Sequence, residues 1–429
     1  MKRYYGKETE AAMRNFPFSS PPLEKELVYA VALIKEAAAR AWREEGGLDD
    51  KRTNAIVRAC REVAAGKFDD QFSLPALQGG AGTSFHMNVN EVIAARANEV
   101  LRRGRAGSKV HPNDHVNKGQ STNDVIPSAV KIVCYRVAEE AILATDRMIA
   151  SLTRRARGFG GIVKLGRTHL QDAVPTTLKN EFLSYAAALT RDKEAVRAVM
   201  PCLLDLNLGA TAIGSSVNAP AGFRKHMYVH LRRLTRLSVK PARNLFAQTW
   251  SAADFCRLSS AFVVLALDAS KMANDLRFMA SGPRGGIGEI KLEPLQAGSS
   301  IMPGKVNPVM LEVLNQLYFV VLGNDISIRE AAQASQMELS VMTPVIADRL
   351  ISSGRLMAQV FRQAADNCIA RISADPARCR EHLERSMAYA TVLVPQLGYD
   401  RVSALVKEAV KKNLTLREVM DKKRGEKIG

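Results

Sequence analysis

The sequence lacks the features of a membrane-embedded or secreted protein. Its best apolar run, Ala261–Leu267, is far shorter than the roughly 20 residues that cross a bilayer as a helix. Residues Met1–Gly6 contain no apolar core of the kind that a signal peptide needs. We therefore expect a cytoplasmic protein without a membrane-spanning segment.

Cysteines are few and scattered, and aromatic residues make up only 6% of the chain. The six cysteines are not spaced as Cys-x-x-Cys pairs, which argues against both a zinc site and a disulfide framework. Buried free thiols in a reducing compartment are the simpler interpretation. They are Cys60, Cys134, Cys202, Cys256, Cys368 and Cys379.

Negative charge is also scarce, because the formal net charge is +18 at pH 7. The basic clusters, such as those at 154–157 and 232–236, are short and are not interleaved with aromatic residues. We interpret them as solvated surface and as charge at helix C-termini, and expect no nucleic-acid partner. A non-catalytic basic interaction protein stays a remote alternative. A positive field would also attract an anionic substrate.

Apolar residues at helical spacing dominate the chain, which has 429 residues and is 47% hydrophobic. No segment indicates a sheet, so the sequence predicts a mainly α fold, with residues 4–17 irregular. The apolar set from Ile126 to Leu152 predicts one helix of about eight turns, and hence an elongated bundle. Other helices are expected over Glu24–Glu45, Thr53–Ala65, Met87–Leu101, Thr176–Met200, Ser251–Ala280, from Asn307 to about Val321, and over Glu338–Ala365 with a bend at Pro344.

One expected helix carries a heptad pattern, which is typical of helices that pack along a continuous seam. We interpret this seam as part of a bundle shared between subunits; an ordinary core within one chain is the alternative. Its residues are Phe262, Leu265, Ala269, Met272, Leu276 and Met279.

The segment Gly298–Glu312 reads Gly-Ser-Ser-Ile-Met-Pro-Gly-Lys-Val-Asn-Pro-Val-Met-Leu-Glu. Its glycines free the backbone, and Ser299, Ser300 and Lys305 place polar groups on a movable loop. Asn307-Pro308 indicates a helix start, with asparagine as the N-cap and proline at the first helical position. The sequence thus predicts a hydroxyl-bearing loop that leads into an anion-attracting helix N-terminus.

Three further segments have a similar design: 78–84, 119–124 and 165–175. Each places glycine, hydroxyl, amide or imidazole groups immediately before an expected helix. Brought together, such groups would hold carboxylates without many arginines. His169 in the third segment has no Cys or carboxylate partner at metal-ligand spacing, so we expect no metal site.

The Gly298–Glu312 segment resembles the signature loop of the aspartase/fumarase superfamily of lyases, and the resemblance extends from Tyr4 to about Leu416. It implies a three-domain lyase with a central bundle of very long helices, divided at 1–112, 113–365 and 366–429. It also implies a homotetramer in which three subunits share each active site.

Several details resemble aspartase more than class II fumarase, notably Gly80-Ala81-Gly82-Thr83-Ser84 and Ser121-Thr122-Asn123. The resemblance therefore implies reversible elimination of ammonia from L-aspartate to give fumarate through an enediolate intermediate. Hydration of fumarate to malate by the same fold is the alternative. No organic cofactor or catalytic metal is implied.

The resemblance also implies a role for each matching residue, with Ser299, Lys305 and His169 as the catalytic set. Ser299 would be the base, activated by loop amides and by nearby Lys305. Glu312 would orient Lys305. The implied contacts are Lys305, Asn307 and Thr168 with the α-carboxylate, Thr83, Ser121, Thr122 and Ser300 with the β-carboxylate, and Asn123 and His169 with the amino group.

The chain departs from the family pattern at a few positions. His86 and Ala95 stand where the family usually has asparagine, and Lys118-Gly119 is unusual before Gln120. The C-terminal region is shorter than is common. These departures bear on substrate preference and regulation more than on the chemistry.

Overall fold

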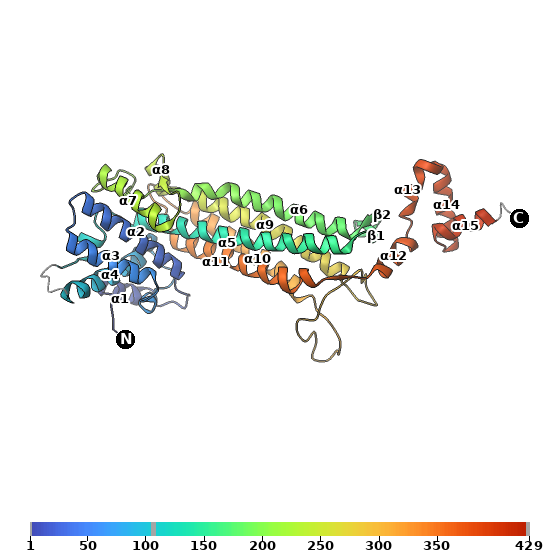
Figure 1. Cartoon of the computed structure of the whole chain (residues 1–429), viewed down its shortest axis with the longest axis horizontal. Coiled ribbons are helices and arrows are strands. Elements are labelled where there is room, and N and C mark those ends of the chain that lie inside the picture. The colour runs from blue at the N-terminus through green and yellow to red at the C-terminus, as the bar shows by residue number, and fades with distance from the viewer. Residues whose placement is uncertain (1, 104–108, 426–429) are drawn as a thin grey trace. The chain divides into compact units, whose positions relative to one another are not determined.

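The computed structural model of the chain describes residues 2–103 and 109–425 and is mainly helical. The residues form two compact units. Unit 1 consists of 1–142, 194–264 and 319–358, and unit 2 consists of 143–193, 265–318 and 359–429. Long helices contribute residues to both units, which confirms the expected bundle of very long helices (Figure 1). They are α5 Thr122–Phe159, α6 Leu178–Val199, α9 Ala253–Met279, α10 Val309–Gln333 and α11 Thr343–Asn367.

Unit 1 adds shorter helices to its share of the long ones, and α2 packs against both α3 and α7. These elements are α1 Lys7–Asn15, α2 Lys25–Glu44, α3 Asp50–Ala64, α4 Thr83–Arg103, α7 Ala221–Thr235 and α8 Leu245–Trp250, with the turns η1 Asp69–Gln71, η2 Gly80–Gly82, η3 Pro112–Val116 and η4 Met200–Leu204, and the parallel strands β3 Asp205–Leu206 and β4 Lys240–Pro241.

Unit 2 contains two antiparallel strand pairs and the C-terminal helices. Helix α12 packs against β1, and a small apolar cluster holds α14 and α15 together. These elements are β1 Val163–Thr168 paired with β2 Gln171–Thr177, β5 Ile290–Lys291 paired with β6 Ser373–Ala374, η5 Ile369–Arg371, α12 Pro376–Arg385, α13 Tyr389–Leu397, α14 Tyr399–Lys412 and α15 Leu416–Gly425.

The long helices pack tightly within each unit. In unit 1, Gly354 of α11 lies against Val137 of α5 and Phe262 of α9, where the absence of a side chain permits the close approach. In unit 2, the Asn315 amide of α10 donates to the Ser270 hydroxyl of α9 at 2.8 Å. Apolar packing and buried hydrogen bonds therefore both fix the bundle.

The interpretation of the α9 heptad seam as a contact between subunits was wrong. All six seam residues, from Phe262 to Met279, are at most 5% exposed within the single chain. Other apolar side chains are exposed instead, including Val264 and Phe278 on α9 and Phe319 and Ile326 on α10. The seam is thus an intramolecular core, and the apolar surface available to a partner lies elsewhere on these helices.

Helix α10 is long and apolar enough to cross a membrane by length and composition alone, in contrast to the expectation from the sequence. Its polar side chains, however, bond to neighbouring helices: Asn315 to Ser270, and Asn324 to the Ser353 hydroxyl at 2.9 Å. Buried core helices of a protein bundle pass the same compositional test. We therefore assign α10 to the bundle.

Several other expectations were wrong. Residues 7–15 form α1 rather than an irregular segment, and residues 163–177 form the β1–β2 hairpin where no sheet was expected. Helix α11 begins at Thr343, so Pro344 lies in its first turn and bends nothing. The strands escape detection because they are short and mix polar with apolar residues, so that no alternation extends over more than three positions.

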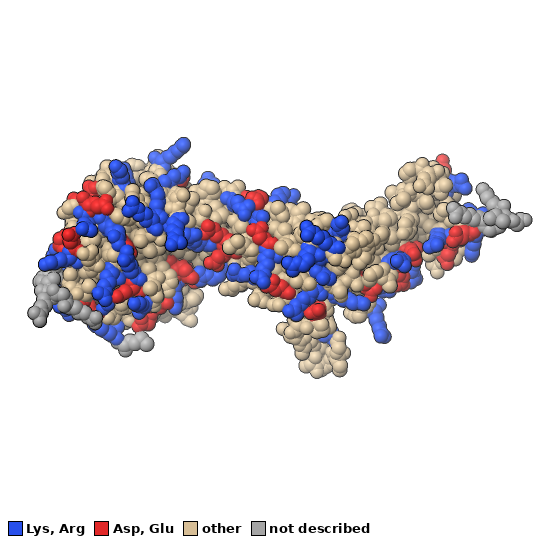
Figure 2. Space-filling view, in the orientation of Figure 1, with Lys and Arg blue, Asp and Glu red and all other residues tan. Residues whose placement is uncertain are grey.

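The surface charges agree with the interpretation of the basic residues as solvated surface. On the face shown in Figure 2, Lys and Arg are interspersed with Asp and Glu. The 232–236 cluster ends α7, where Arg232 and Arg233 lie in the last turn and complement the helix dipole.

Replacing Gly354 by alanine tests the packing of the long helices. A Cβ atom would lie 2.4 Å from Val137 Cγ1 and 2.8 Å from Phe262 Cε2, so Gly354→Ala should lower the free energy of unfolding by about 1–3 kcal/mol. The matched control is Gly158→Ala on α5, where a Cβ meets nothing within 4 Å and should stabilise by about 0.5–1 kcal/mol. Urea unfolding at fixed protein concentration measures both; equal effects would contradict this packing.

Candidate active site

The residues that the sequence singles out divide between the two units. Thr83, Ser121, Thr122 and Asn123 belong to unit 1 and form what we call half-site 1. The remaining candidate residues belong to unit 2, and we call this set half-site 2; they are Thr168 and His169 in one segment and Ser299, Ser300, Lys305, Asn307 and Glu312 in another.

Thr83 begins α4 at the end of a strongly turned glycine loop. Gly80, Ala81 and Gly82 have φ angles of 73°, 57° and 89°. Glycine adopts such left-handed conformations at little energetic cost. The Thr83 hydroxyl donates to the Gly80 carbonyl at 2.6 Å, and Thr83 itself is exposed. The loop therefore presents Thr83 to solvent at a helix N-terminus.

The start of α5 is fixed by the buried carboxylate of Asp124. Its Oδ1 accepts from the Ser121 amide at 3.0 Å, and its Oδ2 accepts from the amides of Gly209 and Thr211 at 3.0 Å each. Burial nevertheless raises the pKa of Asp124 to about 6, because desolvation outweighs these bonds and the attraction of Lys35. Asp124 thus ties the 209–211 loop to the helix end that carries half-site 1.

A proline in α5 explains a second tie to this loop. Pro127 lies in the second turn of α5, and it has no N–H to donate to the carbonyl of Asn123. The side-chain amide of Asn207 donates to that carbonyl instead, at 2.9 Å. The side-chain amide of Asn123 in turn donates to the Ala212 carbonyl at 2.7 Å. These bonds orient Asn123.

The unusual Lys118-Gly119 pair fits against Trp42. The Trp42 indole donates to the Lys118 carbonyl at 2.7 Å, and the Lys118 ammonium lies 5.0 Å from the centre of the indole. Gly119 has a φ of 64°, and a Cβ there would lie 2.6 Å from Trp42. Glycine is therefore required by the close approach of this ring. Nothing in the structure explains Ala95.

In half-site 2, Thr168 and His169 lie at the tip of the β1–β2 hairpin. His169 and Leu170 form its two-residue turn, with φ angles of 56° and 59°. Consecutive left-handed residues are typical of the tight turns that suit strand twist. Thr168, His169 and Leu170 are all exposed, so the hairpin presents the imidazole outward.

A buried ion cluster supports this hairpin. Lys164 Nζ lies 2.7 Å from Glu181 Oε1 and 3.0 Å from Glu289 Oε2, and Arg167 Nη1 lies 2.9 Å from Glu289 Oε1. Glu289 is completely buried. Burial raises the pKa of Glu181, against the effect of the nearby Lys164. The cluster holds β1 to α6 and to the segment that precedes the signature loop.

The Ser299 hydroxyl oxygen accepts two backbone hydrogen bonds within the signature loop. The amides of Ile301 and Met302 donate to Ser299 Oγ at 3.2 Å and 3.1 Å. Donors to an oxygen favour its negatively charged form, so this arrangement lowers the cost of an alkoxide. Ser300 and Lys305 are exposed on the same loop.

Asn307 closes the base of this loop and does not act as the N-cap. Its side-chain amide donates to the Gly298 carbonyl at 2.6 Å, and α10 begins two residues later, at Val309. A Cβ on Gly298 would lie 1.8 Å from the Lys305 carbonyl oxygen, so only glycine allows this closure. Among the described residues, Lys305 and Glu312 form no ion pair with each other.

The residue types in the two sets, each taken by itself, are of kinds that bind carboxylates. They offer hydroxyls, an ammonium group, an imidazole and helix N-termini, all of which bind carboxylate oxygens. Within residues 2–103 and 109–425, no group of three His, Cys, Asp or Glu side chains is placed to hold a metal ion.

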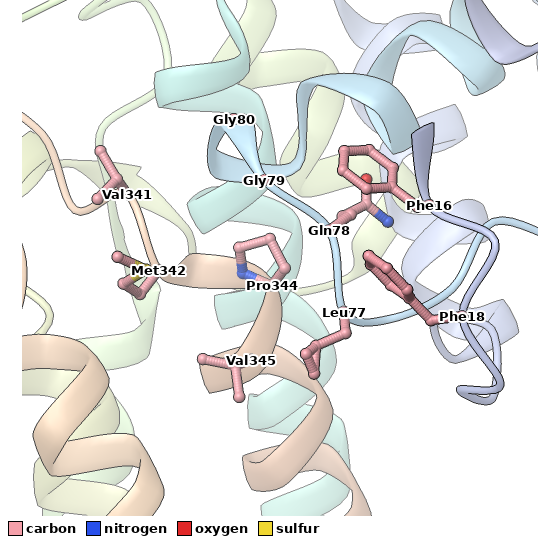
Figure 3. Close-up of a pocket in the computed structure, with 10 residues that line it drawn as sticks. All are labelled: Phe16, Phe18, Leu77, Gln78, Gly79, Gly80, Val341, Met342, Pro344 and Val345. Carbon is pink, nitrogen blue, oxygen red and sulfur yellow. The ribbon is translucent and has the colours of Figure 1, made fainter. Parts of the chain in front are cut away.

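A cavity of about 480 Å³ lies in unit 1 beside the glycine loop (Figure 3). Figure 3 shows Phe16 and Phe18 on one side of Leu77 and the residues of α11 on the other. Its lining is largely apolar and contains none of the residues of either half-site. It therefore does not suit a dicarboxylate.

Three residues with structural importance for the half-sites were missed by sequence reasoning. They are Asp124, Asn207 and Glu289, each of which acts through backbone or buried contacts to distant segments. Pro127 was the available signal for Asn207, because a proline inside a helix leaves a carbonyl that needs another donor. Glu289 follows a glycine-rich stretch, and no local pattern marks it.

Comparison with known proteins gives a consistent set of relatives. A family model described as Lyase matches residues 1–323. An aspartate ammonia-lyase from Bacillus sp is 42% identical over 97% of this chain and 89% of its own length. A class II fumarate hydratase from Methylorubrum extorquens is 40% identical over 97% of this chain and 89% of its own.

Solved structures give the same picture. A Brucella melitensis protein described as fumarate lyase:delta crystallin, bound to cobalt, has a TM-score of 0.95 and 41% identity, covering 99% of this chain and 93% of that one. A class II fumarase from Schistosoma mansoni has a TM-score of 0.94 and 34% identity, covering 99% and 92%.

Substitution of Glu289 tests the buried ion cluster. Glu289→Gln keeps the shape of the side chain and removes its charge. Glu181 is then the remaining carboxylate of the cluster for both Lys164 and Arg167. The free energy of unfolding should therefore fall by about 3 kcal/mol. Glu293→Gln is the control, because Glu293 is exposed and its ion pair with Arg371 is long, at 3.4 Å. Its effect should stay within about 0.5 kcal/mol. Denaturant midpoints that do not differ would contradict this role of Glu289.

Proposed function

Because the chain belongs to the aspartase/fumarase superfamily of lyases, we propose that it eliminates ammonia reversibly from L-aspartate to give fumarate. The observation that carries this proposal is the Ser299 hydroxyl, whose oxygen accepts from two loop amides. Such an oxygen is prepared to lose its proton and then to act as a base. The aspartate ammonia-lyases among the relatives support aspartate as the substrate.

In this mechanism Ser299 takes a proton from the substrate Cβ. The electron pair moves into the β-carboxylate and forms an enediolate, which then expels ammonia to leave fumarate. Donors at that carboxylate stabilise the transition state, because negative charge develops there. The proposed donors are Thr83, Ser121, Thr122 and Ser300.

The remaining half-site residues hold the other end of the substrate. Lys305, Asn307 and Thr168 would bind the α-carboxylate, and Asn123 and His169 would contact the amino group. The Asn307 side chain also braces the loop through Gly298, so it has a structural role in addition. Glu312 would orient Lys305 once the loop closes over the substrate.

We further propose a cytoplasmic homotetramer with each active site shared by three subunits, and a three-domain division at 1–112, 113–365 and 366–429. The exposed apolar side chains on α9 and α10 suit burial between subunits. The division of the candidate residues into two half-sites suits a shared site. The six free cysteines suit a reducing compartment.

Hydration of fumarate to malate is the second candidate reaction, and class II fumarases at 39–40% identity over 97% of the chain favour it. Both reactions remove a leaving group from Cα of a dicarboxylate through the same carbanion chemistry. They differ in that group, which is ammonia in one and water in the other.

An assay of fumarate absorbance separates the two reactions. With purified protein, L-aspartate should give fumarate at a rate at least about tenfold above that with L-malate at equal concentrations, a difference of only about 1.4 kcal/mol in transition-state energy. The reverse reaction should consume fumarate in the presence of ammonium. Turnover of malate alone would replace the first proposal by the second.

Ser299→Ala should abolish most turnover while the protein still folds. Loss of a positioned base typically costs about 10²–10⁴ in kcat. Ser327→Ala is the matched control, because Ser327 is an exposed serine on α10 whose hydroxyl donates to the Gly323 carbonyl. Steady-state kinetics and circular dichroism on both variants measure the effect. Near-normal kcat in Ser299→Ala would show that another group is the base.

A further inference from the structure

A buried lysine–histidine pair lies directly behind Thr122 of half-site 1. Lys35 of α2 is 0% exposed and His86 of α4 is 1% exposed. Lys35 Nζ lies 2.7 Å from His86 Nε2, and His86 Nδ1 lies 2.9 Å from Thr122 Oγ1. A single hydrogen-bonded chain therefore connects a buried amine to a hydroxyl of half-site 1.

The partners of Lys35 account for all three hydrogens of an ammonium group. Besides His86, Nζ donates to Asn117 Oδ1 at 2.8 Å and to Gln120 Oε1 at 3.1 Å. The amide nitrogens of Asn117 and Gln120 are used elsewhere, since they donate to backbone carbonyls of Gln120, Val116 and Lys118. Both side-chain oxygens are thereby fixed toward Lys35 as acceptors.

This arrangement determines which nitrogen of His86 carries the hydrogen. Because the third ammonium hydrogen points at Nε2, that nitrogen must be an acceptor, and the neutral ring carries its hydrogen on Nδ1. Burial and the adjacent Lys35 hold the pKa of His86 well below its usual value, so the ring stays neutral. Nδ1–H then donates to Thr122 Oγ1.

We propose that Lys35 and His86 are positioning residues that force the Thr122 hydroxyl to donate its own hydrogen to a substrate carboxylate. The lone pairs of Thr122 face the imidazole donor, and its hydrogen finds no acceptor in the described part of the chain. This inference rests on the proposed function for the assignment of Thr122 to a carboxylate. It adds two residues to that site and gives His86 a role.

The chain of hydrogen bonds should reverse when Lys35 loses its proton. Burial lowers the pKa of Lys35 to about 7, although Asp124 raises it. The titratable groups that face it are Cys60 on α3, His86 on α4 and Asp124 on α5. A neutral amine has a lone pair that can accept a hydrogen bond from His86 Nε2–H. The His86 Nδ1 atom would then accept the hydroxyl hydrogen of Thr122, which would no longer be available to a carboxylate. Affinity for a dicarboxylate should therefore fall as pH rises through about 7.

The test is binding of succinate, which has two carboxylates and no leaving group, to the full-length protein by calorimetry. At about pH 6.5, His86→Leu should raise the succinate Kd about tenfold, the loss of one charge-assisted hydrogen bond. His86→Asn should stay within about threefold of the unmodified protein, because its amide nitrogen keeps a donor near the Nδ1 position. Equal loss in both variants would overturn the proposal.

A double-mutant cycle separates positioning from a merely structural role. Thr122→Val should weaken binding about tenfold, and adding His86→Leu to it should change the Kd less than about twofold, because His86 acts through Thr122. Additive losses would show that His86 acts otherwise and would overturn the proposal. Unfolding midpoints identify any variant that fails to fold. If His86→Leu fails to fold, the succinate Kd of His86→Asn is compared with that of the unmodified protein instead.

Lys35→Met tests the reversal with pH. The unmodified protein should bind succinate about tenfold more weakly at about pH 8.5 than at about pH 6.5, whereas Lys35→Met should bind weakly with little change between them. Lys25→Met on the same helix, at an exposed position where Lys25 pairs with Asp69, should behave as the unmodified protein. An unchanged pH dependence in Lys35→Met would overturn the proposal.

The outcomes also separate this inference from the proposed reaction. If succinate binding follows the expected pattern but aspartate is not turned over, the reaction is wrong and the role of Lys35 and His86 stands. If aspartate is turned over but His86→Leu binds succinate normally, the reaction stands and the role is wrong. No binding of succinate by the unmodified protein would overturn the role, because Thr122 would then serve no dicarboxylate.

Discussion

In each unit one buried carboxylate joins distant segments, one of which carries candidate residues. Asp124 accepts three backbone amides and so holds the 209–211 loop to the start of α5. Glu289 pairs with Lys164 and Arg167 and so holds the hairpin that presents His169. A carboxylate without water costs several kcal/mol unless such partners surround it. The requirement for these partners therefore keeps the loops in place, although loops contribute little apolar burial of their own.

The long helices could be predicted from the sequence because their apolar residues repeat over many turns. Helix α5 has Ile126, Val130, Val133 and Val137 at spacings of three and four, and all are buried as expected. The β1–β2 hairpin could not be predicted in this way. Its strands are short and mix polar with apolar residues. An ion cluster holds it to Glu289, more than a hundred positions away, and its turn uses His169-Leu170 rather than glycine.

The candidate residues were singled out for a different reason, because short motifs of glycine, hydroxyl and amide groups predicted helix starts; this is confirmed at Thr83 and Thr122 but wrong at Thr168 and His169, which lie at the tip of a hairpin. Their detailed roles could not be predicted. Asn307 has the sequence position of an N-cap, yet its side chain donates to Gly298, because the loop must close on itself before α10 begins. The heptad seam was assigned to the wrong partner for a similar reason: the pattern shows that a face is buried, and only coordinates show what buries it.

His86 illustrates how a departure from a family pattern can preserve a physical requirement. Asparagine, which is usual at this position in the family that the chain resembles, and histidine with its hydrogen on Nδ1 both offer an N–H near the same point. Asparagine has that donor at every pH. Histidine has it only when its other nitrogen accepts a hydrogen bond, and the Lys35 ammonium supplies that bond. In this chain the donor to Thr122 therefore depends on the protonation of a second, buried residue.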